Sequence, residues 1–154
     1  MLSPRVRWTA QVVALVFLLT YLIWFPQTYT IVGESMEPNL HDGGRSMVIH
    51  QSYTINRFDI VIIDNGDKLI IKRIAGLPGE DVIFLNGHLF INNNEIEQPF
   101  LPEIMLTRIE AYRFCLAANE YFVLGDNRPV SMDSRAIGPV KRKDIKGKMA
   151  FRIW

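Results

Sequence analysis

An uncharged apolar run near the N-terminus limits what this chain can fold into more than any other feature. No charged residue lies between Trp8 and Phe25, and only Thr9, Gln11 and Thr20 interrupt the apolar character. A helix of this length spans about 27 Å, close to the thickness of about 30 Å of a bilayer's hydrocarbon core. The sequence therefore predicts one transmembrane anchor helix over residues 8–25.

Arg5 and Arg7 precede this run and set its expected orientation. The positive-inside rule predicts that residues 1–7 form a short cytoplasmic N-terminus and that residues 26–154 form an extracytoplasmic β-rich domain. A cleavable signal peptide also begins with basic and then apolar residues, but no small-x-small cleavage site follows Phe25. We therefore expect a single-pass protein of the cell membrane, with the lipid bilayer as a partner.

The remainder of the chain has the pattern of a compact, mostly antiparallel β fold, without long helical periodicity after residue 30. Asn86-Gly87 separates two apolar runs and predicts a two-residue hairpin loop. The segment 98–119 fits a loop, a strand or a short helix equally well. The expected strands cover residues 46–50, 59–64, 69–75, 82–85, 88–92, 121–124 and 148–154.

Composition excludes several classes of function. The 154 residues include 17 basic and 16 acidic side chains, for a net charge of +1, so the basic excess of a nucleic-acid-binding protein is absent. A lone Cys115 cannot form an internal disulfide. His41, His50 and His88 lack metal-ligand spacing, and no phosphate loop or dinucleotide fingerprint occurs. We expect no metal, no small-molecule cofactor and no nucleic-acid partner.

Two short segments together predict a serine nucleophile and a lysine base. Gly33-Glu34-Ser35-Met36-Glu37-Pro38 places a serine in a short turn, and Leu69-Ile70-Ile71-Lys72-Arg73-Ile74 alternates as a strand. A serine hydroxyl needs a base to become a good nucleophile, and a lysine is a base only when its amine is neutral. Ile70 and Ile74 share a strand face with Lys72. Burial there would lower the lysine pKa from about 10.4 towards about 8, at a cost of roughly 3 kcal/mol.

Each segment also has an ordinary explanation when it is taken alone. Ser35 would then be a turn residue that bonds its own backbone, and Met36 would fill the core. Lys72 and Arg73 would be two solvated basic residues on an edge strand. A third segment, Gly125-Asp126-Asn127-Arg128-Pro129-Val130-Ser131-Met132-Asp133-Ser134-Arg135, completes an ordered set and favours the catalytic interpretation.

The three segments in this order resemble the type I signal peptidases, which are membrane-bound serine proteases that remove signal peptides from exported proteins. The resemblance runs from the N-terminal anchor through Trp154. It implies a barrel-like core in its minimal form, and precursor proteins bearing signal peptides as partners. It also implies that Ser35 is the acylating nucleophile, that Lys72 is the general base and acid, and that the Ser131 hydroxyl orients the lysine amine.

The resemblance implies further supporting residues around this pair. Some family members use a side-chain hydroxyl two residues before the nucleophile to bind the oxyanion. Gly33 occupies that position here, so we expect backbone donors, among them the Ser35 N–H, and the second donor stays open. Gly125 is expected to let the lysine chain pack closely. A polar shell, which a loop of structural salt bridges would explain equally well, comprises Asp126, Arg73, Asp133 and Arg135.

Substrate selection is expected to depend on shallow apolar pockets, because the family recognises small side chains at the first and third positions before the cut. Ordinary β-core packing also accounts for the residues at the matching positions. They are all apolar or aromatic, and comprise Tyr29, Ile31, Val32, Met36, Leu40, Ile70 and Ile71.

Two other functions compete with a general signal peptidase. One is a non-catalytic or dedicated-substrate relative that acts as a membrane-tethered partner in the assembly of secreted or pilus proteins. The non-catalytic relatives typically lack the serine or the lysine, whereas Ser35 and Lys72 are both present here. The other is a self-cleaving repressor protease with the same dyad, which the apolar run and the absence of a DNA-binding helical domain disfavour.

Overall fold

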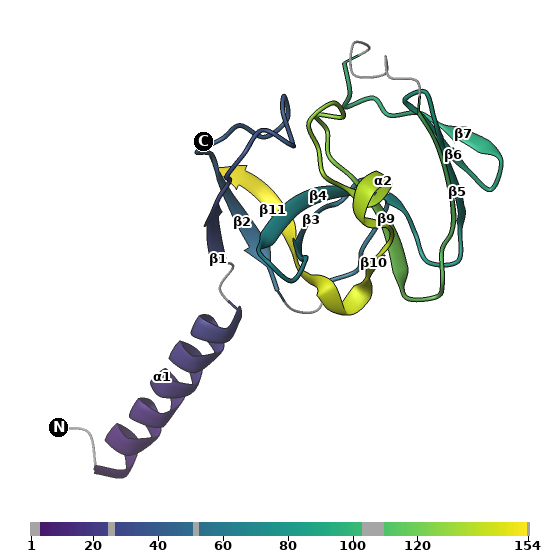
Figure 1. Cartoon of the computed structure of the whole chain (residues 1–154). Coiled ribbons are helices and arrows are strands. Elements are labelled where there is room, and N and C mark those ends of the chain that lie inside the picture. Colours follow the sequence, from purple (N-terminus) through teal and green to yellow (C-terminus); the bar gives the residue numbers. More distant parts are fainter. Residues whose placement is uncertain (1–3, 25–26, 51–52, 103–109, 154) are drawn as a thin grey trace.

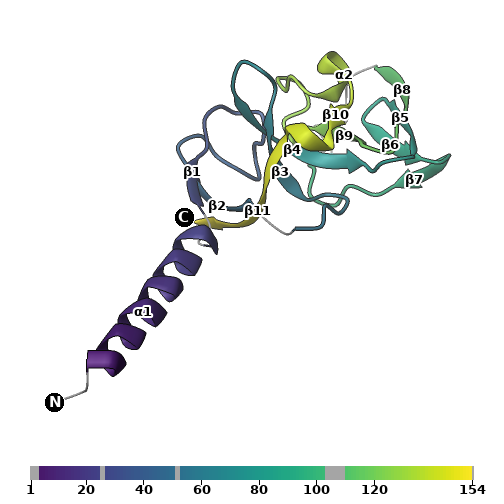
Figure 2. The same cartoon turned by 90° about the horizontal axis from the view of Figure 1, so that it is seen from below.

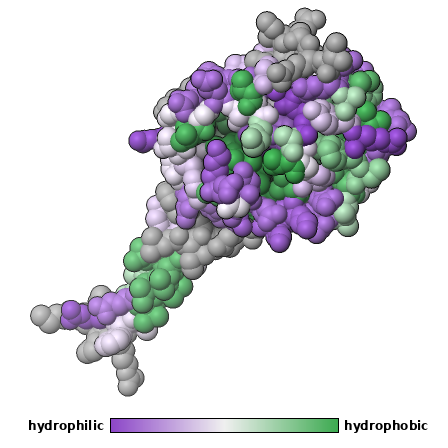
Figure 3. Space-filling view, in the orientation of Figure 1, coloured by the Kyte–Doolittle hydropathy of each residue, from purple (hydrophilic) through white to green (hydrophobic). Residues whose placement is uncertain are grey.

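The computed structural model describes residues 4–24, 27–50, 53–102 and 110–153. A single long helix, α1 (Pro4–Trp24), precedes a body of antiparallel strands and projects away from it (Figures 1 and 2). Figure 3 shows hydrophobic residues along α1 and hydrophilic residues over much of the visible face of the β body. Within the described residues, no helix combines the length and the apolar character that crossing a membrane requires.

The larger sheet has seven strands and curls into a half-barrel (Figure 1). All of its neighbouring strands pair antiparallel. In spatial order the strands are β1 (Gln27–Thr30), β2 (Arg45–Ile49), β11 (Ile145–Ile153), β3 (Ile60–Asp64), β4 (Leu69–Gly76), β9 (Glu120–Leu124) and β10 (Val140–Lys141).

A smaller sheet of four antiparallel strands lies between β4 and β9 in the sequence. Its strands in spatial order are β7 (Asn94–Ile96), β6 (His88–Ile91), β5 (Asp81–Leu85) and β8 (Ala111–Cys115). Two short helical turns, α2 (Ser134–Ile137) and η2 (Arg142–Asp144), connect the last strands. The mostly β, antiparallel fold predicted from the sequence is therefore confirmed.

The strand that carries the candidate lysine lies inside the larger sheet. β4 pairs with β3 on one side and β9 on the other. Ile70 and Ile74 pack in one hydrophobic cluster, whereas Ile71 packs in another, as the predicted alternation requires. The solvated edge-strand explanation of Lys72 is wrong, because an interior strand leaves that side chain only 3% exposed.

The hairpin predicted at Asn86-Gly87 is confirmed. Asn86 has φ +51° and Gly87 has φ +88°, so both loop residues are left-handed, as the common two-residue hairpin turn requires. β5 and β6 pair in register on either side of the loop. Val82, Phe84 and Leu89 point from this hairpin into the core and are buried.

The strands that the sequence did not predict are short or lack buried positions. β1, β7 and β10 have four, three and two residues, too few to show an alternating pattern. β8 resolves part of the ambiguous segment 98–119, and none of its five residues is fully buried. Residues 103–109 and residue 154 lie outside the described part. The last strand begins at residue 145, three residues earlier than predicted.

Candidate active site

Buried apolar side chains anchor the turn that carries Ser35 to the core. Met36 and Leu40 are 1% and 2% exposed and pack together with Ile31. The Leu40 N–H donates to the Met36 carbonyl over 2.8 Å, and the Ile31 N–H donates to the Gly44 carbonyl over 2.7 Å. Buried residues on both sides of Ser35 therefore hold its hydroxyl at the surface of the β body.

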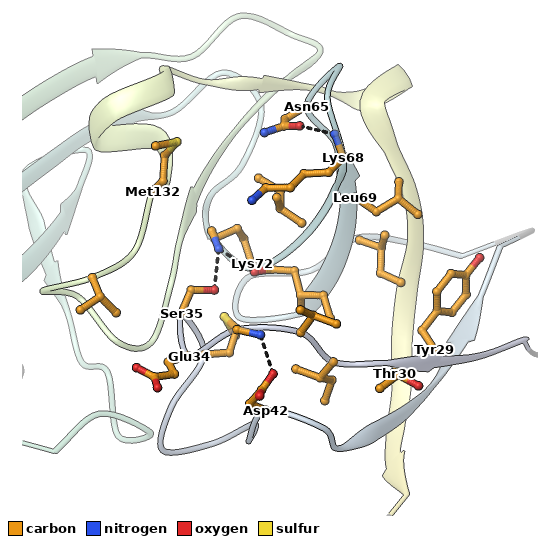
Figure 4. Close-up of a pocket in the computed structure, with 18 of the residues that line it drawn as sticks. Tyr29, Thr30, Glu34, Ser35, Asp42, Asn65, Lys68, Leu69, Lys72 and Met132 are labelled. Atoms are coloured by element: carbon orange, nitrogen blue, oxygen red, sulfur yellow. Dashed lines mark hydrogen bonds between the residues drawn. The ribbon is translucent and has the colours of Figure 1, made fainter.

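Lys72 meets Ser35 from the interior strand β4 (Figure 4). Lys72 Nζ lies 2.8 Å from Ser35 Oγ and also donates to the Ile71 carbonyl over 2.9 Å. Burial lowers the pKa of the Lys72 amine from 10.5 to about 8, although the negative charges of Asp133 and Asp126 oppose the shift. Two residues 37 positions apart in sequence thus meet in the geometry that a nucleophile and its base would need.

The third segment packs directly against the backbone of Ser35. The Asn127 N–H donates to the Ser35 carbonyl over 3.0 Å. A Cβ atom on Gly125 would lie 2.1 Å from Ser131 Oγ and 2.5 Å from the Ser35 carbonyl oxygen. A glycine is therefore needed at position 125, because Ser35 and Ser131 occupy the space that a side chain there would fill. Close packing of the Lys72 side chain against Gly125 stays a prediction.

Ser131 lies beside the dyad without a bond to it. Its Oγ is buried and has no hydrogen-bond partner among the described residues. The two bonds of Lys72 Nζ go to Ser35 and Ile71 instead. A buried hydroxyl without a partner is unfavourable, so Ser131 is poised to bond a polar group that arrives or changes charge.

A buried ion pair joins the strand of the lysine to the third segment. Arg73 Nε donates to Asp126 Oδ1 over 2.8 Å, and a second guanidinium nitrogen donates to Oδ2 over 2.6 Å. Asn39, four residues after the nucleophile, donates to the same carboxylate over 2.9 Å. Asp126 is 1% exposed. It therefore links the serine turn, β4 and the third segment by charge-assisted bonds.

Asp133 and Arg135 hold the third segment in shape. The Gly125 N–H donates to Asp133 Oδ2 over 2.9 Å, and the same side chain caps α2 by accepting from the Arg135 N–H. The Arg135 guanidinium donates to Asp133, to Glu110 over 2.8 Å and to the Arg128 carbonyl over 2.7 Å. The structure brings every predicted supporting residue to this region.

The backbone of Gly33 has a partner that the sequence analysis missed. Its N–H donates to Asp42 Oδ1 over 2.7 Å, with Gly33 at φ +93°. The Gly33 N–H is therefore engaged. The Ser35 N–H donates to no acceptor among the described residues. Neither the spacing nor the residue type in the sequence pointed to Asp42, because the contact depends on how the loop folds back.

A cleft of about 720 Å³ opens over the dyad. It is lined by six of the seven predicted substrate-binding residues: Tyr29, Ile31, Val32, Met36, Ile70 and Ile71. The seventh, Leu40, does not line the cleft and packs in the core beneath it. The exposed side chains of Val130, Met132 and Ile137 also line it, and the sequence analysis did not select them. Val130 and Met132 are apolar and flank the polar Ser131, and this alternation could have identified them as cleft residues from the sequence.

Comparisons with known proteins identify the family. A profile described as "Signal peptidase, peptidase S26" matches residues 5–154. The chain belongs to this family. It is 31% identical to signal peptidase I of Streptococcus pneumoniae, an alignment that covers 86% of this chain and 84% of that protein. It is 36% identical to signal peptidase I V of Bacillus subtilis, over 77% of this chain and 80% of the relative.

A solved structure agrees with this assignment. A crystal structure of a signal peptidase I from Enterococcus faecalis matches with a TM-score of 0.57 and 29% identity, covering 64% of this chain and 98% of that one. The resemblance drawn from the three segments is thereby confirmed. The protein is a signal peptidase, and therefore a serine endopeptidase.

Proposed function

We propose that this signal peptidase cleaves precursor proteins after a small residue, with Ser35 as nucleophile and Lys72 as general base and acid. The observation that carries the proposal is the 2.8 Å separation of Ser35 Oγ from a buried amine. With a pKa of about 8, about a tenth of Lys72 is neutral at pH 7. At the pKa of an exposed lysine, only about one amine in 3,000 would be neutral.

The reaction follows from this geometry. Neutral Lys72 accepts the proton of the Ser35 hydroxyl while Oγ attacks the carbonyl carbon of the scissile bond. The Ser35 N–H is a donor for the oxyanion that forms. The Lys72 ammonium then gives its proton to the leaving amine, and the bond breaks. Lys72, neutral again, activates a water molecule that hydrolyses the acyl-enzyme.

Ser131 has a place in this cycle. We assign its hydroxyl the role of orienting Lys72, because it is buried beside the dyad and makes no other hydrogen bond within the described structure. During acylation Lys72 becomes an ammonium, which has one more N–H donor than the neutral amine. A Ser131 oxygen that accepts from this donor stabilises the charged intermediate, in which the demand for a partner is greatest.

The lining of the cleft favours substrates with small side chains before the scissile bond. Its wall near the nucleophile is formed by apolar residues of the segment before Ser35 and of β4, among them Ile31, Ile70 and Ile71. β1 is the last strand on its side of the sheet, so its outer edge can pair with an extended substrate. Main-chain bonds would then hold precursors of different sequence in one register, and the apolar pockets would exclude bulk.

We also propose that residues 8–25 anchor the enzyme in the cell membrane, with residues 1–7 in the cytoplasm and residues 26–154 outside it. Five successive residues of α1, Leu15 to Leu19, are each about half or more exposed, so no face of this stretch is packed against protein. An exposed helical stretch that is apolar on all sides is typical of a lipid environment. A bilayer contact would bring the cleft close to membrane-bound precursors.

The test is cleavage of a precursor with an Ala-x-Ala site by the detergent-solubilised full chain, with the new N-terminus mapped by mass spectrometry. We expect cutting directly after that site. Ser35→Ala and Lys72→Ala should abolish it, and Ser131→Ala should slow it less. Ser46→Ala is the matched control, because Ser46 is also buried with an unpartnered Oγ but does not line the cleft. Turnover retained in Lys72→Ala would overturn the assignment.

A further inference from the structure

Two charged side chains in the cleft have no partner in the described part of the chain. The Asp42 carboxylate accepts from the Gly33 N–H, and the Asn65 side chain accepts from the backbone of its own turn. In contrast, the Lys68 ammonium and the Glu34 carboxylate make no hydrogen bond or ion pair with the residues that the structure describes, although both line the cleft. These two charges are available to a bound peptide.

Lys68 is directed at the reaction centre. It immediately precedes β4 and lines the cleft together with Ile70 and Lys72. Figure 4 shows the Lys68 side chain reaching from the β3–β4 turn towards Lys72. Burial is the main cause of the lowered pKa of Lys72, and the positive charge of Lys68 lowers that pKa further, as expected for a nearby cation.

We propose that Lys68 selects substrates by binding an acidic side chain of the precursor near the scissile bond. This inference rests on the proposed function. A peptide in the cleft displaces water from the Lys68 ammonium, which has no acceptor among the described residues to replace it. A substrate carboxylate restores that interaction, whereas a lysine or arginine at the same position is repelled.

Glu34 makes the preference depend on position. It lies on the other side of Ser35 from Lys68 and points away from Lys72 (Figure 4). The cleft therefore carries opposite charges on the two sides of the nucleophile. An acidic substrate residue is favoured where it faces Lys68 and disfavoured where it faces Glu34. A uniform attraction of acidic peptides would not produce this difference.

The experiment compares precursors that carry Asp or Asn at each position flanking the cut in turn. The full-length wild-type enzyme, Lys68→Gln and Lys68→Glu are assayed in detergent, and the ratio of kcat/KM for Asp over Asn is recorded at each position. The wild-type ratio should reach about two- to fivefold at one position, the range of a solvent-exposed ion pair. It should approach one in Lys68→Gln and fall below one in Lys68→Glu.

The ratio of kcat/KM for Asp over Asn precursors separates substrate selection by Lys68 from a change in the pKa of Lys72. Either substitution of Lys68 also raises the pKa of Lys72, but this slows the Asp and Asn precursors equally and cancels. Lys143→Glu is the matched control, because Lys143 is exposed and does not line the cleft. It should keep the wild-type ratio. Added salt should reduce the wild-type preference.

Equal Asp-to-Asn ratios at every position in the wild-type enzyme and Lys68→Glu would overturn the proposal. Failure of the proposed function gives a different result, because the wild-type enzyme would then leave the Asn precursors uncut, or would cut them without Ser35.

Discussion

Replacing Lys72 by Met should increase the free energy of unfolding at neutral pH. The substitution removes a buried amine whose charged form is disfavoured in the folded protein. The pKa of Lys72 falls from 10.5 to about 8 on folding. At about 1.4 kcal/mol for each pH unit, the ionisation of this one side chain lowers the free energy of unfolding by about 3 kcal/mol at pH 7. Methionine has a similar length and carries no charge.

The pH dependence identifies the cause. Above about pH 10.5 the amine is neutral in both states, and its ionisation does not affect stability. As the pH falls, the unfolded chain binds the proton first, so native stability drops until about pH 8, below which both states are protonated. The contribution of ionisation is therefore about 3 kcal/mol at pH 7 and about 1 kcal/mol at pH 9.5.

The assay is thermal unfolding of wild type and Lys72→Met in the same detergent at pH 7 and pH 9.5, followed by near-ultraviolet circular dichroism. The loss of the bonds to Ser35 and Ile71 offsets the gain by about 1 kcal/mol each at both pH values. The difference in Tm between variant and wild type should thus shrink by about 4–8 °C between the two pH values.

Lys143→Met is the matched control, because Lys143 is an exposed lysine and its loss removes no buried charge. Its Tm difference from wild type should be the same at both pH values. A Tm difference for Lys72→Met that is independent of pH, like that of the control, would refute the buried-amine argument even if the variant were inactive.

Three other results are expected. The kcat/KM for precursor cleavage should fall about tenfold per pH unit below about pH 8 and level off above it, because only neutral Lys72 accepts the Ser35 proton; a pH–rate profile measures this. Gly125→Ala should reduce cleavage at least about a hundredfold, since the new methyl group collides with the Ser35 carbonyl; steady-state kinetics beside circular dichroism would separate this from unfolding. Asp126→Ala should cost about 3–5 kcal/mol in urea unfolding, because it leaves the Arg73 guanidinium buried without its carboxylate.

The sequence predicted the larger strands and the hairpin because their signals are local. β3 and β4 have apolar residues at buried positions, and Asn86-Gly87 needs the positive φ angles that it has. β8 could not be predicted in this way, since its side chains alternate only between exposed and half-buried positions. Its place as an edge strand depends on pairing with β5, which is a contact between residues about 30 positions apart.

The candidate site was also predicted only where local sequence signals exist. Ser35 and Lys72 could be selected from the sequence because the proposed chemistry requires a nucleophile and a dry amine in recognisable segments, and the structure brings the two side chains within 2.8 Å. Asp42 was missed, since its bond to Gly33 depends on a loop closing on itself. Leu40 was assigned to the substrate pocket because an apolar residue beside a nucleophile fits a pocket and a core equally well, and only packing distinguishes the two.

The reactivity of Lys72 depends on segments that are far apart in the sequence. β3 and β9 flank β4, the Met36 turn lies against it, and Asp126 ties β4 to the turn and to the third segment. Until these parts assemble, the amine has the pKa of an exposed lysine and is about 300-fold less often neutral at pH 7. A substitution that loosens this packing should therefore move the pH–rate profile towards higher pH before it unfolds the enzyme. Loss of activity without such a shift would indicate damage to the nucleophile or the cleft instead.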